Sequence, residues 1–268
     1  MAPILVHIAL LAYAVGAAAF LSWLVRPRQG FVRAGRVLLL AGVIVHFAAF
    51  AVSLGVAGAG LGVSAWKGGQ LFSLLAAVTV AGYLVLDFKY ELPVAGAFVA
   101  PFTVAVMVPA HLVQSNARII APEISHNLVL FVHVGAAALG TAVLALAFGL
   151  AILYLVSEKQ VKSKRPGRLF ARLPSLDLLD RASYRLAVWG FVFLSLAIAT
   201  GSTFPIAPKQ GFAVLAWALF ASLIQARLVA GWRGRRVAML VVAGFVLLIG
   251  TYVGLLTAAA PASHGMAA

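Results

Sequence analysis

The sequence has no cysteine among its 268 residues. That absence excludes disulfide bonds, thiolate metal sites and cysteine nucleophiles from this chain. Acidic residues are also scarce, with only 6 against 20 lysines and arginines. Charged side chains are nearly absent from the long apolar runs, so no relay of carboxylates for protons or ions is visible. This argues against a proton-coupled transporter.

Charged residues make up 10% of the chain and apolar residues 64%, whereas soluble domains are closer to a quarter charged and half apolar. A chain with this balance cannot hide its apolar surface from water, so we expect lipid to be its solvent. No polar stretch is long enough for a separate soluble domain. We therefore expect a single membrane domain over residues 1–268.

Apolar runs of about 20 residues, the length of a helix that crosses a bilayer, occur repeatedly. Alternation of apolar and polar residues over about ten positions, as in a membrane barrel strand, does not occur. We predict an all-α fold, a polytopic membrane bundle of eight transmembrane helices. The predicted spans are 3–25, 36–58, 70–88, 92–113, 127–156, 184–204, 211–230 and 236–258.

The basic residues are distributed unevenly between the predicted connections. Those after the first, third, fifth and seventh spans hold every lysine and arginine except Lys67, Arg118 and Lys209. Basic residues favour cytoplasmic connections, which places both termini on the outer face. The net charge of +14 is thus explained by orientation, and we expect no nucleic-acid partner. The first span has arginines after it and none before, the reverse of a signal peptide, and is expected to be retained.

The connection at about 157–183 is the only sizeable cytoplasmic element. Its segment 175–181 predicts a short amphipathic helix with leucines facing inward and Asp177 and Asp180 facing outward. The basic flank of the connection is expected to touch anionic lipid headgroups. A structural elbow is the simpler interpretation, and a docking surface for a cytosolic enzyme is the alternative.

Histidine is the main polar side chain left for chemistry. In the predicted orientation no histidine lies in a cytoplasmic loop, and five of the six lie toward the outer face: His7, His111, His126, His133 and His264. The sixth, His46, lies mid-span. Neutral imidazole is a common axial ligand of haem iron, and an apolar pocket with two histidines is a b-type haem site. A lone span histidine is more often hydrogen-bonded to a neighbouring carbonyl or serine than bound to metal. His46 and His133 have the most weight because they are deepest, and zinc is disfavoured because no carboxylate or cysteine accompanies them.

Several segments, in order, resemble the cytochrome c assembly family, which includes CcsA, CcmC and HemX-like proteins. The matching stretches are Gly96-Ala-Phe-Val-Ala-Pro-Phe, Ser157-Glu-Lys-Gln-Val-Lys-Ser-Lys-Arg, Leu173-Pro-Ser-Leu-Asp-Leu-Leu-Asp-Arg-Ala-Ser-Tyr-Arg, Gly190-Phe, Ile198-Ala-Thr-Gly, Arg227-Leu-Val-Ala-Gly-Trp-Arg-Gly-Arg-Arg and Gly244-Phe-Val-Leu-Leu-Ile-Gly-Thr-Tyr-Val-Gly. The eight-helix plan is closest to the HemX-like branch. The resemblance implies a non-covalent haem b, with His133 and His264 as axial ligands of the iron and His46 as a further haem-binding residue.

The chain also departs from the family pattern. The outer tryptophan-rich loop of cytochrome-assembly members, Trp-Asp-Pro-Lys-Glu-Thr-Trp, is replaced by Ile206-Ala-Pro-Lys-Gln-Gly-Phe212, and an in-span histidine expected on the seventh helix is Gln225. These changes put the transfer of haem to apocytochrome c, and an inner bis-histidine site, in doubt. Trp66, Phe204 and Phe212 are aromatic residues near the outer face that could pack against the porphyrin, although an interfacial anchor is the better interpretation of Trp66.

These features predict a haem-binding protein of the bacterial inner membrane that holds or relays haem at the outer half of the bundle and is not an enzyme. Its expected partners are haem, membrane lipid, and either cytochrome c maturation components or an enzyme of tetrapyrrole synthesis. An enzyme of tetrapyrrole synthesis would be the partner in an alternative function, in which the protein is a HemX-like scaffold that regulates this enzyme through Lys162, Lys164 and Arg165. A small-molecule permease is the third, supported faintly by Pro101 and Pro109 within the fourth span.

Overall fold

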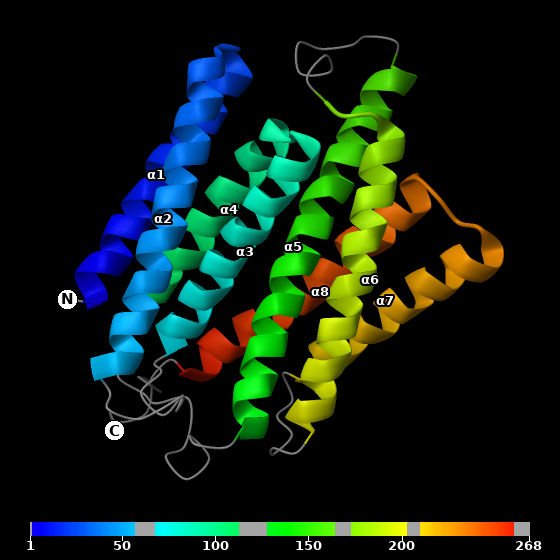
Figure 1. The fold of residues 1–268 in the computed structure, drawn as a ribbon. Coiled ribbons are helices and arrows are strands. Elements are labelled where there is room, and N and C mark those ends of the chain that lie inside the picture. Colours follow the sequence, from blue (N-terminus) through cyan, green and yellow to red (C-terminus); the bar gives the residue numbers. More distant parts are fainter. Residues whose placement is uncertain (1, 57–67, 113–127, 164–172, 203–209, 260–268) are drawn as a thin grey trace, which may run out of the picture.

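A computed structural model describes residues 2–56, 68–112, 128–163, 173–202 and 210–259. Within these ranges the regular structure is entirely helical, with no strand, and eight helices follow one another along the chain (Figure 1). They are α1 (Ala2–Val25), α2 (Gln29–Val56), α3 (Gly68–Tyr90), α4 (Pro93–Leu112), α5 (Leu128–Lys162), α6 (Leu176–Gly201), α7 (Gln210–Ala230) and α8 (Arg235–Ala259).

Seven of these helices are long and apolar enough to cross a membrane, and Pro93–Val108 in α4 forms a shorter apolar helix. The predicted fold, an all-helical membrane bundle with eight helices, is therefore confirmed. The placement of both termini outside follows from the positive-inside rule and stays a prediction.

Local sequence signals explain where several helices begin and end. Pro27 follows the end of α1, and a residue before proline is disfavoured in helical geometry. Pro93 is the first residue of α4, where its missing N–H costs nothing. Ser175 caps α6, since its hydroxyl oxygen accepts a hydrogen bond from the Leu178 backbone N–H at 3.3 Å.

Helix α5 lies at the centre of the bundle and connects its two halves (Figure 1). It packs most extensively against α6 and also contacts α3 and α8. One buried cluster, around Tyr13, Phe20 and Tyr83, fills the half built by α1 to α4. A second, around Phe220, Leu223 and Phe245, fills the half built by α5 to α8.

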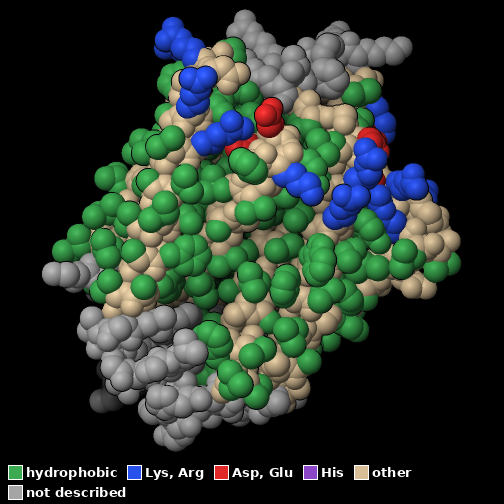
Figure 2. Space-filling model, in the orientation of Figure 1, with side chains coloured by type: hydrophobic (Ala, Val, Ile, Leu, Met, Phe, Trp, Pro, Cys, Tyr) green, Lys and Arg blue, Asp and Glu red, His purple; other side chains and the backbone are tan. Residues whose placement is uncertain are grey.

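Helices α1, α3 and α5 end at one end of the bundle, the upper end in Figure 1, whereas α1 begins and α8 ends toward the other. Lys and Arg side chains gather over the same upper end in Figure 2, and much of the surface below it is apolar. The charge asymmetry predicted from the sequence is thus an asymmetry of the folded bundle. This is the distribution expected of a chain oriented by basic cytoplasmic loops.

The region between the fifth and sixth spans differs from the sequence prediction. Segment 175–181 is not a separate short helix, because α6 runs without a break from Leu176 to Gly201. Helix α5 in turn continues to Lys162, so only residues 163–175 fall between the two helices of the predicted 157–183 connection. Within this continuous helix, the buried Ser183 hydroxyl donates to the Ala147 carbonyl of α5 at 3.0 Å and joins this turn of α6 to its neighbour.

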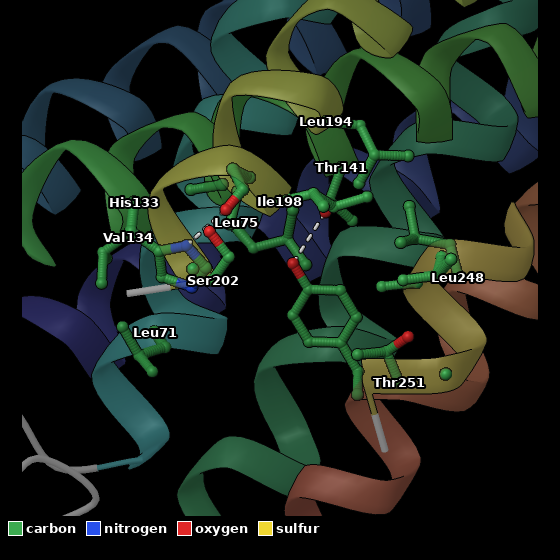
Figure 3. A pocket seen from close by; sticks show the side chains of 18 of the residues that line it. Leu71, Leu75, His133, Val134, Thr141, Leu194, Ile198, Ser202, Leu248 and Thr251 are labelled. Carbon is green, nitrogen blue, oxygen red and sulfur yellow. Dashed lines mark hydrogen bonds between the residues drawn. The ribbon is translucent and has the colours of Figure 1, made fainter. Parts of the chain in front are cut away.

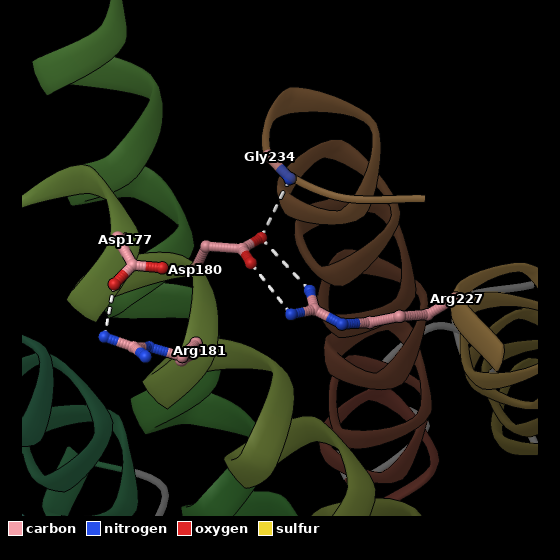
Figure 4. Close-up of polar contacts among 5 residues, drawn as sticks. All are labelled: Asp177, Asp180, Arg181, Arg227 and Gly234. Atoms are coloured by element: carbon pink, nitrogen blue, oxygen red, sulfur yellow. Dashed lines mark hydrogen bonds and ion pairs between the residues drawn. The ribbon is translucent and has the colours of Figure 1, made fainter. Parts of the chain in front are cut away.

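The prediction that Asp180 faces outward is also wrong. Its carboxylate accepts two hydrogen bonds from Arg227 of α7, at 3.1 and 2.8 Å, and a third from the Gly234 backbone N–H at 2.8 Å (Figure 4). The Arg227 guanidinium lies over the Tyr184 ring, 4.2 Å from its centroid. Gly234 has φ +67°, a conformation that glycine adopts without strain. The Asp180 carboxylate therefore ties α6 to α7 and to the start of α8.

A second ion pair joins the other half of the bundle. Arg36 of α2 donates from Nε to one oxygen of Asp87 of α3 at 2.6 Å, and from a terminal nitrogen to the other at 3.1 Å. Asp87 is buried. Sequence patterns gave no sign of either pair, because the partners come from different helices.

Replacing Asp180 by alanine should destabilise the bundle by about 3 kcal/mol or more, because Arg227 would stay largely buried without its carboxylate. The matched control is Asp177→Ala, one turn away on the same helix. Asp177 is exposed and pairs only with exposed Arg181, so its loss should cost about 0.5 kcal/mol or less. Unfolding of the purified proteins in detergent, followed by circular dichroism, measures both. Equal losses would show that the Asp180 contacts do not hold the helices.

Candidate functional site

A cavity of about 710 Å³ lies among α3, α5, α6, α7 and α8 (Figure 3). Its volume is within the range of small-molecule and cofactor sites. Most of its wall is aliphatic, and among the described residues that line it there is no acid, lysine or arginine. Leu71, Val134, Leu194, Ile198, Val214 and Leu248 represent the five helices in this wall.

The cavity lies toward one end of the bundle. Its wall uses the first turns of α3, α5 and α7 and the last turns of α6 and α8. The basic connections follow α1, α3, α5 and α7, so they extend from the opposite helix ends. If the basic end is cytoplasmic, as the positive-inside rule predicts, the cavity is in the outer half of the membrane.

His133, one of the residues predicted from the sequence, lines this cavity from the second turn of α5. Its Nδ1 is 2.8 Å from the backbone carbonyl oxygen of Ala197 in α6. A carbonyl oxygen only accepts hydrogen bonds, so Nδ1 carries the proton and the lone pair of the neutral ring is on Nε2. Metal-ligating histidines typically have this arrangement, in which one ring nitrogen donates to a carbonyl and the other binds the metal.

Gly201, at the end of α6, provides the space for the His133 ring. A Cβ atom at this position would lie 2.8 Å from His133 Cε1, which is closer than real Cβ atoms approach, and 3.0 Å from Nδ1. A side chain at position 201 would therefore force the imidazole to shift from its place beside the α6 backbone. The orientation of His133 thus depends on two α6 residues one turn apart, Ala197 and Gly201.

Three hydroxyl groups form the polar part of the wall contributed by α5 and α8. Thr141 Oγ1 and the Tyr252 hydroxyl are 2.7 Å apart and form a hydrogen bond, and Thr251 lines the cavity beside them (Figure 3). Tyr252 also contacts Phe72 of α3 edge to face, with ring centroids 5.8 Å apart. Sequence reasoning missed all three hydroxyls. The spacing of Thr141, eight residues after His133 and so on a similar face of α5, was the one available signal.

His46 does not line this cavity. It is fully buried between α1, α2 and α3, where its Nε2 is 2.6 Å from Ser73 Oγ and its Nδ1 is 3.2 Å from the Tyr13 hydroxyl. Its ring is stacked on Phe50, with centroids 5.4 Å apart. The structure therefore does not bring His46 together with His133, and both nitrogens of His46 are engaged by hydroxyl groups.

The other predicted residues are only partly within the described ranges. His264, His126, Trp66 and Phe204 lie outside them. His7 is exposed on α1, with Nδ1 2.6 Å from the Pro3 carbonyl oxygen, and His111 is in the last turn of α4.

Phe212 is exposed at the start of α7 and is not part of the cavity wall, although its neighbour Gly211 is. Gln225 is exposed on α7. Among the described residues no three histidine or acidic side chains gather as a metal site would require.

The fold and this cavity define a class: a multi-pass helical membrane protein in which His133 faces a chamber whose described wall is apolar. Comparison with known proteins places it further. The sequence model of the family described as Cytochrome C assembly protein matches residues 4–257. The chain belongs to this family, which confirms the predicted resemblance; the closer placement in the HemX-like branch stays a prediction.

Proteins named cytochrome c biogenesis protein CcsA are among the relatives. That of Heterosigma akashiwo is 30% identical over 216 residues, covering 64% of this chain and 67% of the relative. That of Guillardia theta is 28% identical over 199 residues, covering 64% and 66%. The match to the protein of Gloeothece citriformis, 35% identical over 108 residues, covers 37% of this chain and only 33% of that relative. The chain thus matches about a third of this cyanobacterial relative and about two thirds of the other two.

Replacing Gly201 by alanine should displace the His133 ring and break its hydrogen bond to Ala197, because the new methyl group would occupy the position of the ring edge. Gly211→Ala is the matched control: Gly211 lines the same cavity, but a Cβ there would meet nothing within 4 Å. The measurement is the Nδ1 resonance of His133 in histidine-labelled protein by ¹⁵N NMR in micelles. An unchanged resonance in Gly201→Ala would contradict this account of the glycine.

Proposed function

We propose that this protein binds haem b non-covalently in the cavity between α3 and α5 to α8, with the Nε2 atom of His133 as an axial ligand of the iron. The observation that carries the proposal is the His133 imidazole, held in an apolar cavity with its Nδ1–H donated to the Ala197 carbonyl. Haem is large, flat and mostly apolar, so it suits an aliphatic chamber of this size. The absence of cysteine leaves no covalent attachment in this chain.

His264 is the proposed second axial ligand. Helix α8 ends at Ala259, and three residues in or near its last turns, Leu248, Thr251 and Tyr252, line the cavity. Five residues of chain can reach about 17 Å, which is enough to bring an imidazole from position 264 back to the same end of the bundle. When bound to two imidazoles, haem iron is low-spin and available for electron transfer. In this site the chain would provide the ligands, the apolar enclosure and the ring orientation.

His46 is a weaker candidate for the further haem-binding role that the resemblance implied. A neutral imidazole offers a single lone pair, and the His46 ring nitrogens are both within hydrogen-bonding distance of hydroxyls. Ligation there would require Ser73 or Tyr13 to give up its contact with the ring. Its position among α1, α2 and α3 suits a structural role in that half of the bundle.

The role that we propose is to hold or relay haem in the bacterial inner membrane, without making or breaking covalent bonds. Relatives carry the name cytochrome c biogenesis protein, so cytochrome c maturation components are the proposed partners, together with membrane lipid. The chain differs from the family pattern at Ile206 to Phe212 and at Gln225. These differences favour a role in which the protein retains haem, or delivers it to another protein, over one in which it presents haem directly to apocytochrome c.

The visible spectrum of protein purified in detergent after haem-replete expression tests this proposal. A Soret band and sharp reduced α-band are expected, and His133→Ala should remove the band or shift it to that of a singly ligated haem. His7→Ala is the control, because His7 is exposed and bonded to its own helix, and its spectrum should match that of the parent protein.

A parent protein without a Soret band would refute the haem proposal and leave the regulatory scaffold and the permease as the remaining functions. Loss of haem in His7→Ala but not in His133→Ala would refute the ligand assignment alone.

A further inference from the structure

The turn between α7 and α8 concentrates basic residues over a short stretch of chain. Residues 231–234 separate the two helices, and Arg233, Arg235 and Arg236 lie within four consecutive positions. All three side chains are exposed. The turn joins the ends of α7 and α8 that lie away from the cavity, which uses the start of α7 and the last turns of α8. The proposed haem site therefore gives no reason for this group of arginines.

The acidic residues nearest to the turn are already engaged within the protein. Asp180 accepts its three hydrogen bonds from the protein itself (Figure 4). Glu158 of α5 is 3.9 Å from Arg235 and pairs more closely, at 2.7 Å, with a lysine one turn further along its own helix. Arg233 and Arg236 form no ion pair with any residue that the structure describes. Most of the positive charge of the turn is therefore left for a ligand.

Contacts within the protein fix the shape of the turn. The Gly234 N–H donates to Asp180 at 2.8 Å, and the Trp232 N–H donates to a carbonyl near the end of α7 at 3.3 Å. Gly231 and Gly234 have φ +64° and +67°, values that glycine adopts without strain. The Arg236 guanidinium lies over the Trp232 ring, 5.4 Å from its centroid. The backbone that carries the arginines is thus set before a ligand binds, which lowers the entropy cost of binding.

The turn lies where the apolar helices give way to charged residues. The apolar span of α7 ends at Ala230, and that of α8 begins at Arg235. Leu228 and Val229, the last large residues of α7, are 72% and 75% exposed. Along the chain, an exposed aliphatic pair is followed by a tryptophan and then by the three arginines. This order matches one leaflet of a bilayer, which passes from hydrocarbon, through an interface where tryptophan is enriched, to charged headgroups.

We infer that the turn between α7 and α8 binds the headgroup of an anionic membrane phospholipid. Arg233, Arg235 and Arg236 contact its phosphate, because a guanidinium group can donate two parallel hydrogen bonds to phosphate oxygens. Leu228 and Val229 lie against the acyl chains. A soluble anion would use the arginines but leave this aliphatic pair without a role. The site uses no residue of the cavity wall, so the inference does not depend on haem binding.

Native mass spectrometry of the full chain in detergent tests the inference. Titration with dioleoyl phosphatidylglycerol or dioleoyl phosphatidylcholine gives the dissociation constant of the first lipid bound. The parent protein should prefer phosphatidylglycerol, because choline cancels the charge of the phosphate. Replacing Arg233, Arg235 and Arg236 together by glutamine should weaken phosphatidylglycerol binding by a factor on the order of ten or more, since one basic residue near an anionic surface strengthens binding about fivefold. Replacing the same three by lysine keeps the charge and should keep the preference.

Arg26, Arg28 and Arg33 provide the matched control. They are exposed at the same basic end of the bundle, after α1 and at the start of α2, and form no ion pair with a described residue. Their replacement by glutamine removes the same charge and should lower the preference for phosphatidylglycerol much less. Equal losses in the two triple variants would show that total charge sets the preference, and would overturn the site. A parent without a preference, or a preference that survives in the α7–α8 variant, would overturn it as well.

Circular dichroism of each variant verifies the fold. If the triple variant is unstable, Arg233→Gln combined with Arg236→Gln keeps the test decisive, because these two residues have no ion pair to lose among the described residues. This double variant should still weaken phosphatidylglycerol binding several-fold. Glycerol phosphate, a soluble analogue of the headgroup, should compete poorly with the lipid. Full competition by glycerol phosphate would overturn the assignment to a lipid and indicate a site for a soluble anion.

Discussion

Every polar group within a membrane span must find its partner inside the protein, and this constraint governs the whole structure. Asp87 and Asp180 each receive a two-pronged contact from an arginine on a neighbouring helix. His46 lies between two hydroxyls, and most helical serines and threonines bond to the turn before them. Because the rule is followed so widely, the buried hydroxyls of Tyr83 and Thr251, which have no partner among the described residues, are exceptions to it.

The two ion pairs lie toward one end of the bundle, and the cavity lies toward the other. Each half has one arginine–aspartate pair between helices, and both pairs lie in turns adjoining the basic connections. The cavity uses the opposite ends of the helices. Helix α5 joins the halves, and its contact with α6, the most extensive in the bundle, holds His133 to Ala197. The charged end thus fixes the helices relative to one another, and those contacts lie away from the cavity.

Features that depend on neighbouring residues could be predicted from the sequence, and those that depend on distant pairs could not. Apolar run length predicted the helices, and the positions of lysine and arginine predicted which end would be basic. His133 was found because it is a deep histidine in a family-like segment. The sequence prediction placed Asp180 on an exposed helix face because its partner Arg227 is 47 residues away. Locally, the sequence shows only an acidic residue next to leucines, which is the pattern of a short amphipathic helix with its acids facing outward. The Thr141–Tyr252 pair spans 111 residues and left no local pattern.

His133 is hydrogen-bonded to a backbone carbonyl and not to a carboxylate, and this also has a chemical consequence. A carboxylate in that position would fix the same ring tautomer, but it would also place a charge in a chamber whose described wall residues carry none. A carbonyl fixes the same tautomer at no electrostatic cost, and it belongs to α6, whose backbone is already held by packing against α5. Ring orientation is therefore a property of the helix pair, and the absence of a side chain at Gly201 leaves the imidazole the space that it occupies. In the proposed haem site, the tautomer and direction of the imidazole would thus be set by the α5–α6 contact before any ligand enters.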